Sequence, residues 1–303
     1  MSVRIKFLSK LFRGIYLFSM LCALCSAFCI CAANAECDIR GVEKDAPVLC
    51  GVAAQGGFLY GELDENWNVY GGDEKISMNG IFVMGLDRDM PEFLQMRFCK
   101  SSGRALFGKD SCEVFTYKIK QRTYGEQKIT VAKEFDELSP KDQKRADAES
   151  AMVQKARARA INLDATGFLD MELPDNLKPQ RISGVFGTGR IVNGNPRRPH
   201  YGVDIASPRG TKVGAVADGI VIVASDMFYS GNTVIVSHGH GITTSYLHMD
   251  GMNVKAGDVV TRGDKVGVVG STGRSTGPHL HLGAHWRNVA IDPQLVISFG
   301  EKI

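Results

Sequence analysis

Short hydrophobic runs separated by turn-forming residues fill the front of the chain. Three runs rich in aromatic and β-branched residues occupy positions 58–60, 67–70 and 81–84. Glycine, asparagine and aspartate cluster between these runs. Short strands with turn signals at about ten-residue spacing are typical of a small sandwich or barrel. We therefore predict a β-rich N-terminal domain over residues 36–135.

The back half of the chain shows a similar pattern. β-Branched runs at 220–223, 233–236 and 266–269 alternate with glycine-rich turns. No segment here combines helical length with helical periodicity, and strands do not alternate with helices. The pattern predicts an antiparallel β domain over residues 165–303.

One alanine-rich, highly charged run at 141–160 interrupts the β pattern. Ser139 can cap a helix there, and Pro140 suits its first position. Acidic residues near its start and basic residues near its end favour the helix dipole. The run has little apolar face, so we predict a solvated spacer helix within 136–164. The fold class is mainly β: a small N-terminal β-domain, a spacer helix and a C-terminal antiparallel β-sheet domain.

The first 35 residues have the organisation of a secretory signal peptide. Four basic residues and no acid lie between positions 4 and 13, an apolar stretch covers 15–31, and residues 33–35 read Ala-Asn-Ala. This pattern predicts cleavage after Ala35 and an exported, periplasmic protein. A retained membrane anchor is the alternative, because the apolar stretch approaches the length of a spanning helix. A lipoprotein site is disfavoured, since bulky residues precede the candidate cysteines.

Charge and cysteine content agree with export. Removal of residues 1–35 takes away four cations and no acid, which changes the formal charge from +3 to −1. A nearly neutral mature chain argues against a nucleic-acid partner. Four of the eight cysteines (Cys22, Cys25, Cys29 and Cys31) leave with the same segment.

The four remaining cysteines are an even set, which in an exported protein indicates disulfides. Three pairings exist. We favour Cys37–Cys50 and Cys99–Cys112, because each pair closes a short loop between predicted strands. A zinc site made of these four cysteines is rejected, since no two of them have the C-x-x-C spacing of a zinc ribbon.

Candidate chemistry comes from three histidine motifs in the back half. His279 and His281 flank Leu280, and alternate residues of a strand point to the same face. His200 lies four residues before Asp204, and His248 ends an alternating run. Each motif alone is a weak signal, because buried or surface histidines and capping aspartates are common.

Together the motifs supply two nitrogens and one oxygen, a set that suits Zn²⁺ and leaves a fourth position open for water. An open position is typical of a catalytic site. Two further histidines could orient that water and stabilise a tetrahedral intermediate. Spacing alone leaves open whether His279 or His281 is the ligand.

The residues that carry this chemistry resemble a known family. Segments 200–204, 245–248 and 277–281 resemble, in order and spacing, the three signature motifs of the LytM/lysostaphin-like (M23) zinc metallopeptidases. Stretches 184–187, 206–211, 217–219 and 270–277 are also similar. The resemblance is specific from about 181 to 295. The front half resembles, less specifically, the β-domain-plus-helix extension of Gram-negative, alphaproteobacterial-type members.

The resemblance implies a LytM-like peptidase domain of the duplicated hybrid motif type over 165–303. It implies that His200, Asp204 and His281 bind one Zn²⁺ per chain and that His248 and His279 are the catalytic pair. The implied substrate is the peptide cross-link of peptidoglycan, at the D-Ala–diaminopimelate bond in a Gram-negative envelope. No residue that reads the stem peptide is apparent.

Three other histidines are assigned no part in this chemistry. We predict a structural or surface role for His238 and His240, because single histidines are weak evidence for a site. His285 stands four residues beyond His281, and we interpret it as a residue of the cleft wall.

Two rival functions belong to other classes. A non-catalytic LytM-type regulator would activate another wall hydrolase, but such proteins usually lack one or more of the five site residues, and all five are present here. An exported binding module would use its β-domain for recognition and its zinc for structure. We further hypothesise autoinhibition, in which residues 36–135 and the helix restrain access to the cleft, and an envelope regulator as partner.

Overall fold

The computed structural model describes residues 36–64, 66–101, 111–178 and 181–298. All of these residues belong to one compact unit. The predicted signal peptide and its four cysteines lie outside the described residues. Within the described ranges, no helix is both long and apolar enough to span a membrane.

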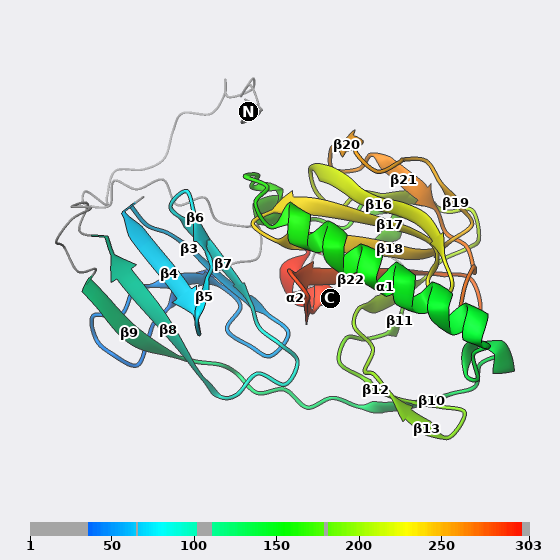
Figure 1. Cartoon of the computed structure of the whole chain (residues 1–303), viewed down its shortest axis with the longest axis horizontal. Coiled ribbons are helices and arrows are strands. Elements are labelled where there is room, and N and C mark those ends of the chain that lie inside the picture. Colours follow the sequence, from blue (N-terminus) through cyan, green and yellow to red (C-terminus); the bar gives the residue numbers. More distant parts are fainter. Residues whose placement is uncertain (1–35, 65, 102–110, 179–180, 299–303) are drawn as a thin grey trace. The chain divides into compact units, whose positions relative to one another are not determined.

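The front of the described chain consists of two antiparallel sheets (Figure 1). The first sheet has the strand order β1 (Glu36–Ile39), β2 (Leu49–Gly51), β3 (Phe58–Glu62), β7 (Ile81–Gly85) and β6 (Ser77–Met78). The second has the order β5 (Glu74–Lys75), β4 (Trp67–Gly71), β8 (Phe93–Lys100) and β9 (Ser111–Lys118). The three predicted hydrophobic runs are therefore strands β3, β4 and β7.

Two disulfides join neighbouring strands of these sheets. Cys37–Cys50 links β1 to β2, and Cys99–Cys112 links β8 to β9. Cys99 and Cys112 are direct cross-strand partners in the β8–β9 ladder. The pairing predicted from loop length is confirmed.

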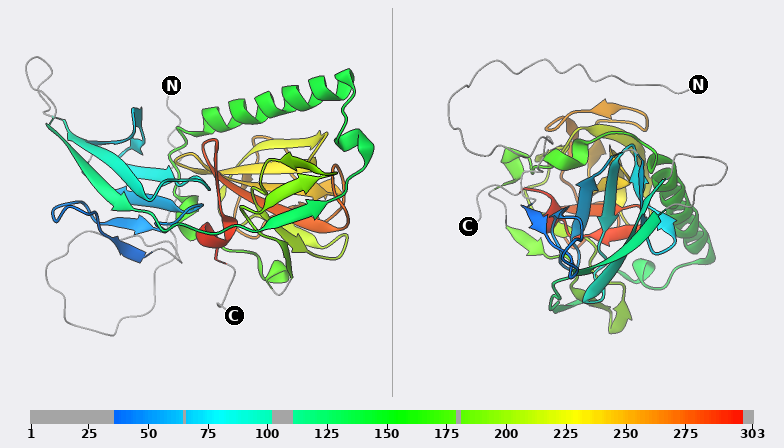
Figure 2. Two further views of the ribbon diagram at one scale, coloured as in Figure 1. Left: turned by 90° about the horizontal axis from the view of Figure 1, so that it is seen from below. Right: turned by 90° about the vertical axis from the view of Figure 1, so that its left-hand side faces the viewer.

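The back half is built on one large antiparallel sheet (Figure 2). Its strand order is β11 (Ile182–Gly184), β14 (Val203–Ala206), β22 (His279–Trp286), β18 (Ile242–Met249), β17 (Gly231–Gly239), β16 (Gly219–Met227) and β20 (Val259–Val260), with β23 (Val289–Ile291) also paired to β22. A small sheet has the order β15 (Lys212–Gly214), β21 (Lys265–Val268) and β19 (Gly251–Met252). This architecture confirms the predicted antiparallel β domain.

A third small sheet joins the end of the front segment to the back half. Strand β10 (Glu126–Ile129) pairs in parallel with β12 (Gly189–Val192), which pairs antiparallel with β13 (Asn195–Arg197). The short helical turns are η1 (Lys133–Phe135), η2 (Gly167–Asp170), η3 (Asp175–Leu177) and α2 (Pro293–Val296). Strand β10, which precedes the predicted helix in the sequence, therefore belongs to a sheet that also contains strands of the back half.

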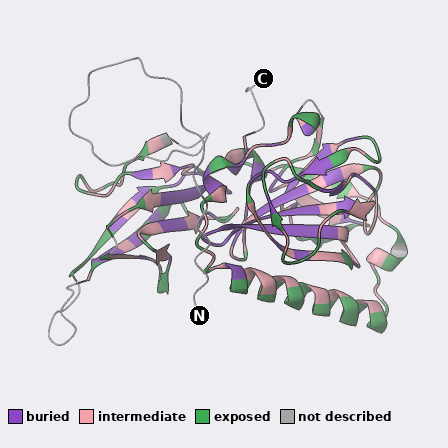
Figure 3. Cartoon of the chain, turned by 90° about the horizontal axis from the view of Figure 1, so that it is seen from above, coloured by how far each residue is buried: buried purple, intermediate pink, exposed green. Residues whose placement is uncertain are grey.

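Helix α1 (Pro140–Ala160) begins where the sequence predicts. The Ser139 hydroxyl accepts a hydrogen bond from the Asp142 amide, and Pro140 occupies the first turn. The helix is not a fully solvated spacer, however, because it packs against β16 and β17. Its outer side remains exposed (Figure 3). Val153 and Ala156 of the helix make the contact. Two small apolar side chains spread over several helical turns are too weak a pattern for this packing to be predicted from the sequence.

One continuous hydrophobic core runs through the front sheets and the large sheet. Tyr60 of β3 packs edge-to-face on Phe168 of η2. Arg122, just after β9, forms an ion pair of 2.8 Å with the buried carboxylate of Asp292. The front strands and the large sheet are therefore fixed to each other by apolar and ionic contacts.

Candidate metal centre and its neighbouring histidines

The candidate site lies on one face of strands β14 and β22. Leu280 and Leu282 of β22 are fully buried, so the alternating residues His279 and His281 point to the opposite face. Asp204 of β14 is the direct cross-strand partner of His281. Cross-strand partners share a face, so strand register alone brings this carboxylate and this imidazole together.

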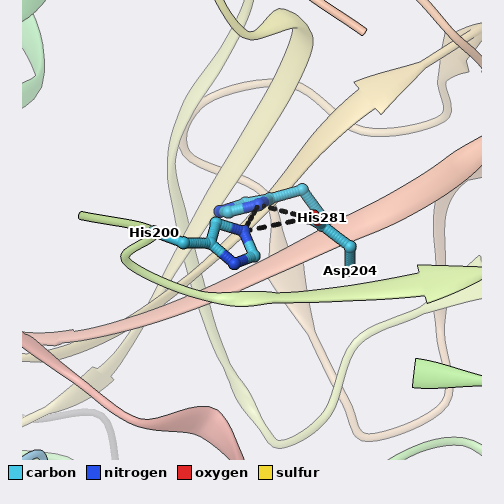
Figure 4. A group of neighbouring side chains, drawn as sticks. All are labelled: His200, Asp204 and His281. Carbon is cyan, nitrogen blue, oxygen red and sulfur yellow. Dashed lines mark hydrogen bonds and ion pairs between the residues drawn. The ribbon is translucent and has the colours of Figure 1, made fainter. Parts of the chain in front are cut away.

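Three ligand-type atoms meet at this point (Figure 4). His200, in the loop before β14, places its Nε2 3.0 Å from Asp204 Oδ1 and 3.0 Å from His281 Nδ1. His281 Nδ1 lies 2.8 Å from the same carboxylate oxygen. These residues form a group that could hold a metal ion, their ligand atoms lying within 4.8 Å of one another.

The protons around this cluster favour a bound cation. His200 Nδ1 lies 3.0 Å from the carbonyl oxygen of Val185, which can only accept, so Nδ1 carries the proton and Nε2 a lone pair. Asp204 contributes a second electron-pair donor. If both imidazole rings are neutral, the three converging atoms, His200 Nε2, Asp204 Oδ1 and His281 Nδ1, carry at most one proton among them. A divalent metal satisfies such a set, and the backbone bond of His200 is the usual orienting contact of a ligand histidine.

Two glycines leave room for these ligands. A Cβ added to Gly202 would lie 2.6 Å from His281 Nε2. A Cβ added to Gly184 would lie 2.4 Å from Asp204 Oδ2 and 3.1 Å from His200 Cε1. Only glycine allows the backbone to approach the site so closely.

Asp204 is held ionised by its surroundings. Burial by itself would raise its pKa, but the imidazoles of His200 and His281, which stabilise the carboxylate when the nitrogen facing it carries a proton, outweigh burial and hold the pKa below its ordinary range. Arg190 of β12 adds a contact of 3.3 Å to Asp204 Oδ2. Arg190 was missed at the sequence level, because no motif marks it and its position depends on the pairing of β12 with β10.

His248 and His279 stand beside this cluster. Their ring centroids are 5.0 Å apart, and the His248 ring is 6.1 Å from that of His281. His279 Nε2 lies 3.7 Å from Asp204 Oδ1. His248 has a positive φ of 62°, which is uncommon for a non-glycine residue.

Backbone carbonyls of the segment 270–277 orient both rings. His248 Nδ1 donates to the Thr272 carbonyl at 2.8 Å, and His279 Nδ1 donates to the Gly277 carbonyl at 2.8 Å. Each neutral ring therefore keeps a lone pair on Nε2. Burial, and after it the neighbouring His281, lower the pKa of His248 to about 3, so this ring is neutral at pH 7.

The other three histidines lie apart from this cluster. His238 is fully buried, between the Asp218 carbonyl and the Thr244 hydroxyl. His240 is buried with its ring 5.6 Å from that of Phe168. His285 lies on the same face of β22 as His281 and contacts Arg157 of α1.

The fold and the cluster define a class of protein, namely an antiparallel β protein with three residues that could hold a metal ion and two further histidines beside them. Sequence comparison matches part of the chain to a known family. Peptidase family M23 matches residues 198–293, a range that includes all five of these residues. The chain therefore carries an M23 peptidase domain.

Similar proteins agree with this assignment. The peptidoglycan DD-endopeptidases ShyB and ShyA of Vibrio cholerae are 39% and 41% identical over 134 and 109 residues, covering 44% and 36% of this chain. The matches cover 30% and 24% of those two proteins, so the chain spans about a quarter to a third of the curated relatives it matches. A crystal structure of an M23 family protein from Pseudomonas aeruginosa is 26% identical with a TM-score of 0.55, covering 82% of this chain and 96% of that one.

Proposed function

We propose that this protein is a zinc-dependent endopeptidase that hydrolyses the peptide cross-links of peptidoglycan, at the D-Ala–diaminopimelate bond. The observation that carries the proposal is the convergence of two histidines, an aspartate and a further histidine pair inside the M23-matched segment. The names of the Vibrio cholerae relatives, both peptidoglycan DD-endopeptidases, support the substrate.

In this proposal His200 Nε2, Asp204 Oδ1 and His281 Nδ1 hold the metal. The N, N, O donor set and the lone pairs that face one another suit Zn²⁺. Zinc bound there would polarise the scissile carbonyl and acidify a water molecule. Arg190 keeps Asp204 in place through its other carboxylate oxygen.

His248 and His279 handle the protons in this mechanism. Each ring has its Nδ1 proton committed to a backbone carbonyl, so Nε2 can accept a proton from the attacking water. Once protonated, the same ring can donate a hydrogen bond to the developing oxyanion or a proton to the leaving amine. No glutamate base is needed, because two oriented imidazoles share these roles.

We also propose that the chain is exported to the periplasm, where its substrate lies. The basic and apolar organisation of residues 1–35 supports export, as do two disulfides between neighbouring front strands. A membrane anchor in place of cleavage would keep the site in the same compartment.

Of the two parts named in the autoinhibition hypothesis, helix α1 is the one to which we assign the restraint of access. Helix α1 packs on the large sheet, and its Glu149 accepts a hydrogen bond of 2.8 Å from the Phe228 amide. We propose that α1 narrows the approach to the site for a bulky polymer while short peptides still enter.

The proposed function is tested by zinc content and by cleavage of a soluble, cross-linked stem-peptide dimer. The wild-type chain should hold one zinc and cut the dimer. His281→Ala should lose both properties, whereas His248→Asn should keep zinc and lose about a hundredfold or more in turnover. His240→Asn is the matched control outside the site, since both histidines have a positive φ that asparagine tolerates. A His248→Asn chain with unchanged turnover, or a zinc-loaded wild type that leaves the dimer intact, would contradict the proposal.

A further inference from the structure

Helix α1 lies on the same face of the large sheet as the candidate metal ligands. His281, Gly283 and His285 alternate along β22 and share one face. Gly283 is paired with Ser245 of β18, and Ser245 is paired with Ile235 of β17. Ile235 therefore belongs to that same face.

Ile235 is one of the residues that α1 covers. Val153 and Ala156 of the helix pack against a small apolar cluster formed by Val223, Met227 and Ile235. Figure 1 shows α1 (green) running along β16 and β17, with β22 beyond them. A helix outside the M23-matched segment thus forms a wall on the face that carries the site.

A cavity of about 390 Å³ separates α1 from part of this face. Arg157 of the helix lines it, together with Arg198, Tyr201, Ser230 and His285. Two of the residues that line the cavity adjoin residues of the candidate site. Tyr201 directly follows the ligand His200, and the Ser230 carbonyl accepts the backbone N–H of His248 at 2.9 Å.

Arg157 brings an unpaired charge into this cavity. Its Nη2 donates to His285 Nδ1 at 3.1 Å, while its Nε is buried without a hydrogen-bond partner. Within the described part of the chain, no carboxylate forms an ion pair with it. The two acids that line the cavity have other partners: Glu149 binds Arg145 and the Phe228 amide, and Asp87 accepts from the Asp89 amide.

A guanidinium in this position needs an anion. Burial lowers the pKa of Arg157 to about 10, so the side chain is still charged at neutral pH. A desolvated charge is costly unless it is paired, and a carboxylate is the geometric match for a guanidinium edge. Arg198 is exposed at the same cavity and adds a second positive charge.

We propose that Arg157, supported by His285 and assisted by Arg198, binds a carboxylate of the peptide substrate. This subsite rests on the proposed function. His285 is four residues from His281, which places the subsite about 13 Å along the strand from the metal ligand. An extended peptide advances about 3.3 Å per residue, so the carboxylate bound there is about four residue lengths from the scissile bond. Stem peptides carry free carboxylates that can occupy it.

The test uses two cross-linked stem-peptide dimers that differ only in whether their carboxylates are free or amidated. In the full chain, Arg157→Gln should raise KM for the free-acid dimer by about tenfold or more, the usual effect of losing a hydrogen bond to a charged group. It should leave kcat for that dimer and KM for the amidated dimer unchanged. Arg157→Lys should recover part of the loss. Arg159→Gln, an exposed change in the last turn of the same helix, should have no effect.

Binding measured by calorimetry separates this inference from the proposed function. In a His281→Ala background, which does not cut, the free-acid dimer should bind more tightly than the amidated dimer, and Arg157→Gln should abolish that difference. This result would support the subsite even if the wild-type chain cleaved neither dimer. Equal binding of both dimers, no binding of either, or an Arg157→Gln chain that gains activity on both would overturn the subsite.

Discussion

Hydrogen bonds to the backbone decide what each histidine of this molecule can do. His200, His248 and His279 all give their Nδ1 proton to a carbonyl oxygen, and this fixes a lone pair on each Nε2. His238 donates to a carbonyl in the same way but turns its Nε2 to the Thr244 hydroxyl, inside the core. Identical tautomers thus serve a candidate metal ligand, candidate bases and a structural residue, according to what faces the free nitrogen.

His238 makes folding stability depend on pH. Burial lowers its pKa from 6.5 to about 4, so the unfolded chain binds a proton that the folded chain resists. The contribution of His238 is complete above pH 6.5 and is lost as the pH falls toward 4. We expect His238→Gln to flatten the decline in the free energy of unfolding between pH 7 and pH 5 by about 2 kcal/mol. Urea unfolding at both pH values measures this, and an unchanged slope would refute it.

The five candidate residues could be identified from the sequence. Which atom of each side chain faces the site could not be predicted in the same way. Strand alternation predicts that His279 and His281 share a face, which the structure confirms. That His281 contributes its Nδ1 depends on its register opposite Asp204 and on the glycine at 202, neither of which is readable from a single sequence. Arg190 and Arg157 come from elements whose placement is set by tertiary packing, so no local signal marks them.

At the scale of elements, the segment that precedes the peptidase domain is built into it. Strand β10 pairs with β12, which positions Arg190, and α1 covers apolar residues of β16 and β17. The start of the helix is predictable, because capping is local chemistry. Its packing is not, because Val153 and Ala156 form only a narrow apolar strip.

The ion pair between Arg122 and Asp292 links the front segment to the start of α2. Asp292 also caps α2 through the Gln294 amide at 2.9 Å, and it is almost fully buried. Removing Arg122 would leave that carboxylate unpaired. We predict that Arg122→Met lowers the free energy of unfolding by about 3 kcal/mol or more.

The matched control for this prediction is Arg262→Met. Arg262 pairs with Asp170 and Glu172 at 2.9 and 3.0 Å on the surface, where loss of such pairs costs about 1 kcal/mol or less. Urea denaturation of both variants gives the comparison. Equal losses would show that the Arg122 pair is no more than a surface contact.

At the scale of the whole molecule, the front strands and the peptidase domain share one core while α1 overlies the functional face. We propose that restraint of access is a property of α1 and its hydrogen bonds, since the helix packs on β16 and β17 of the large sheet. This arrangement separates two properties that can be measured independently: entry of a bulky polymer and cleavage of a short peptide.

Glu149→Ala tests that restraint. The change removes the acceptor of the Phe228 amide and the partner of Arg145, which loosens α1 at its middle. We expect faster cleavage of intact peptidoglycan with an unchanged kcat on a soluble dimer, because a shift of Arg157 would change KM for the dimer and not kcat. Asp147→Ala is the control, because the partner of Asp147 among the described residues is Gln143 of the same helix. If Glu149→Ala alters both rates in parallel, or neither, α1 does not restrain access.

The decisive experiment is digestion of intact, cross-linked diaminopimelate-type peptidoglycan with the zinc-loaded chain, with the products identified by mass spectrometry. We predict that cross-linked dimers become monomers with a new D-Ala carboxyl end and a freed diaminopimelate amine, and that His281→Ala leaves the dimers intact. Dimers that persist in the presence of a chain holding one zinc would refute the proposed endopeptidase activity.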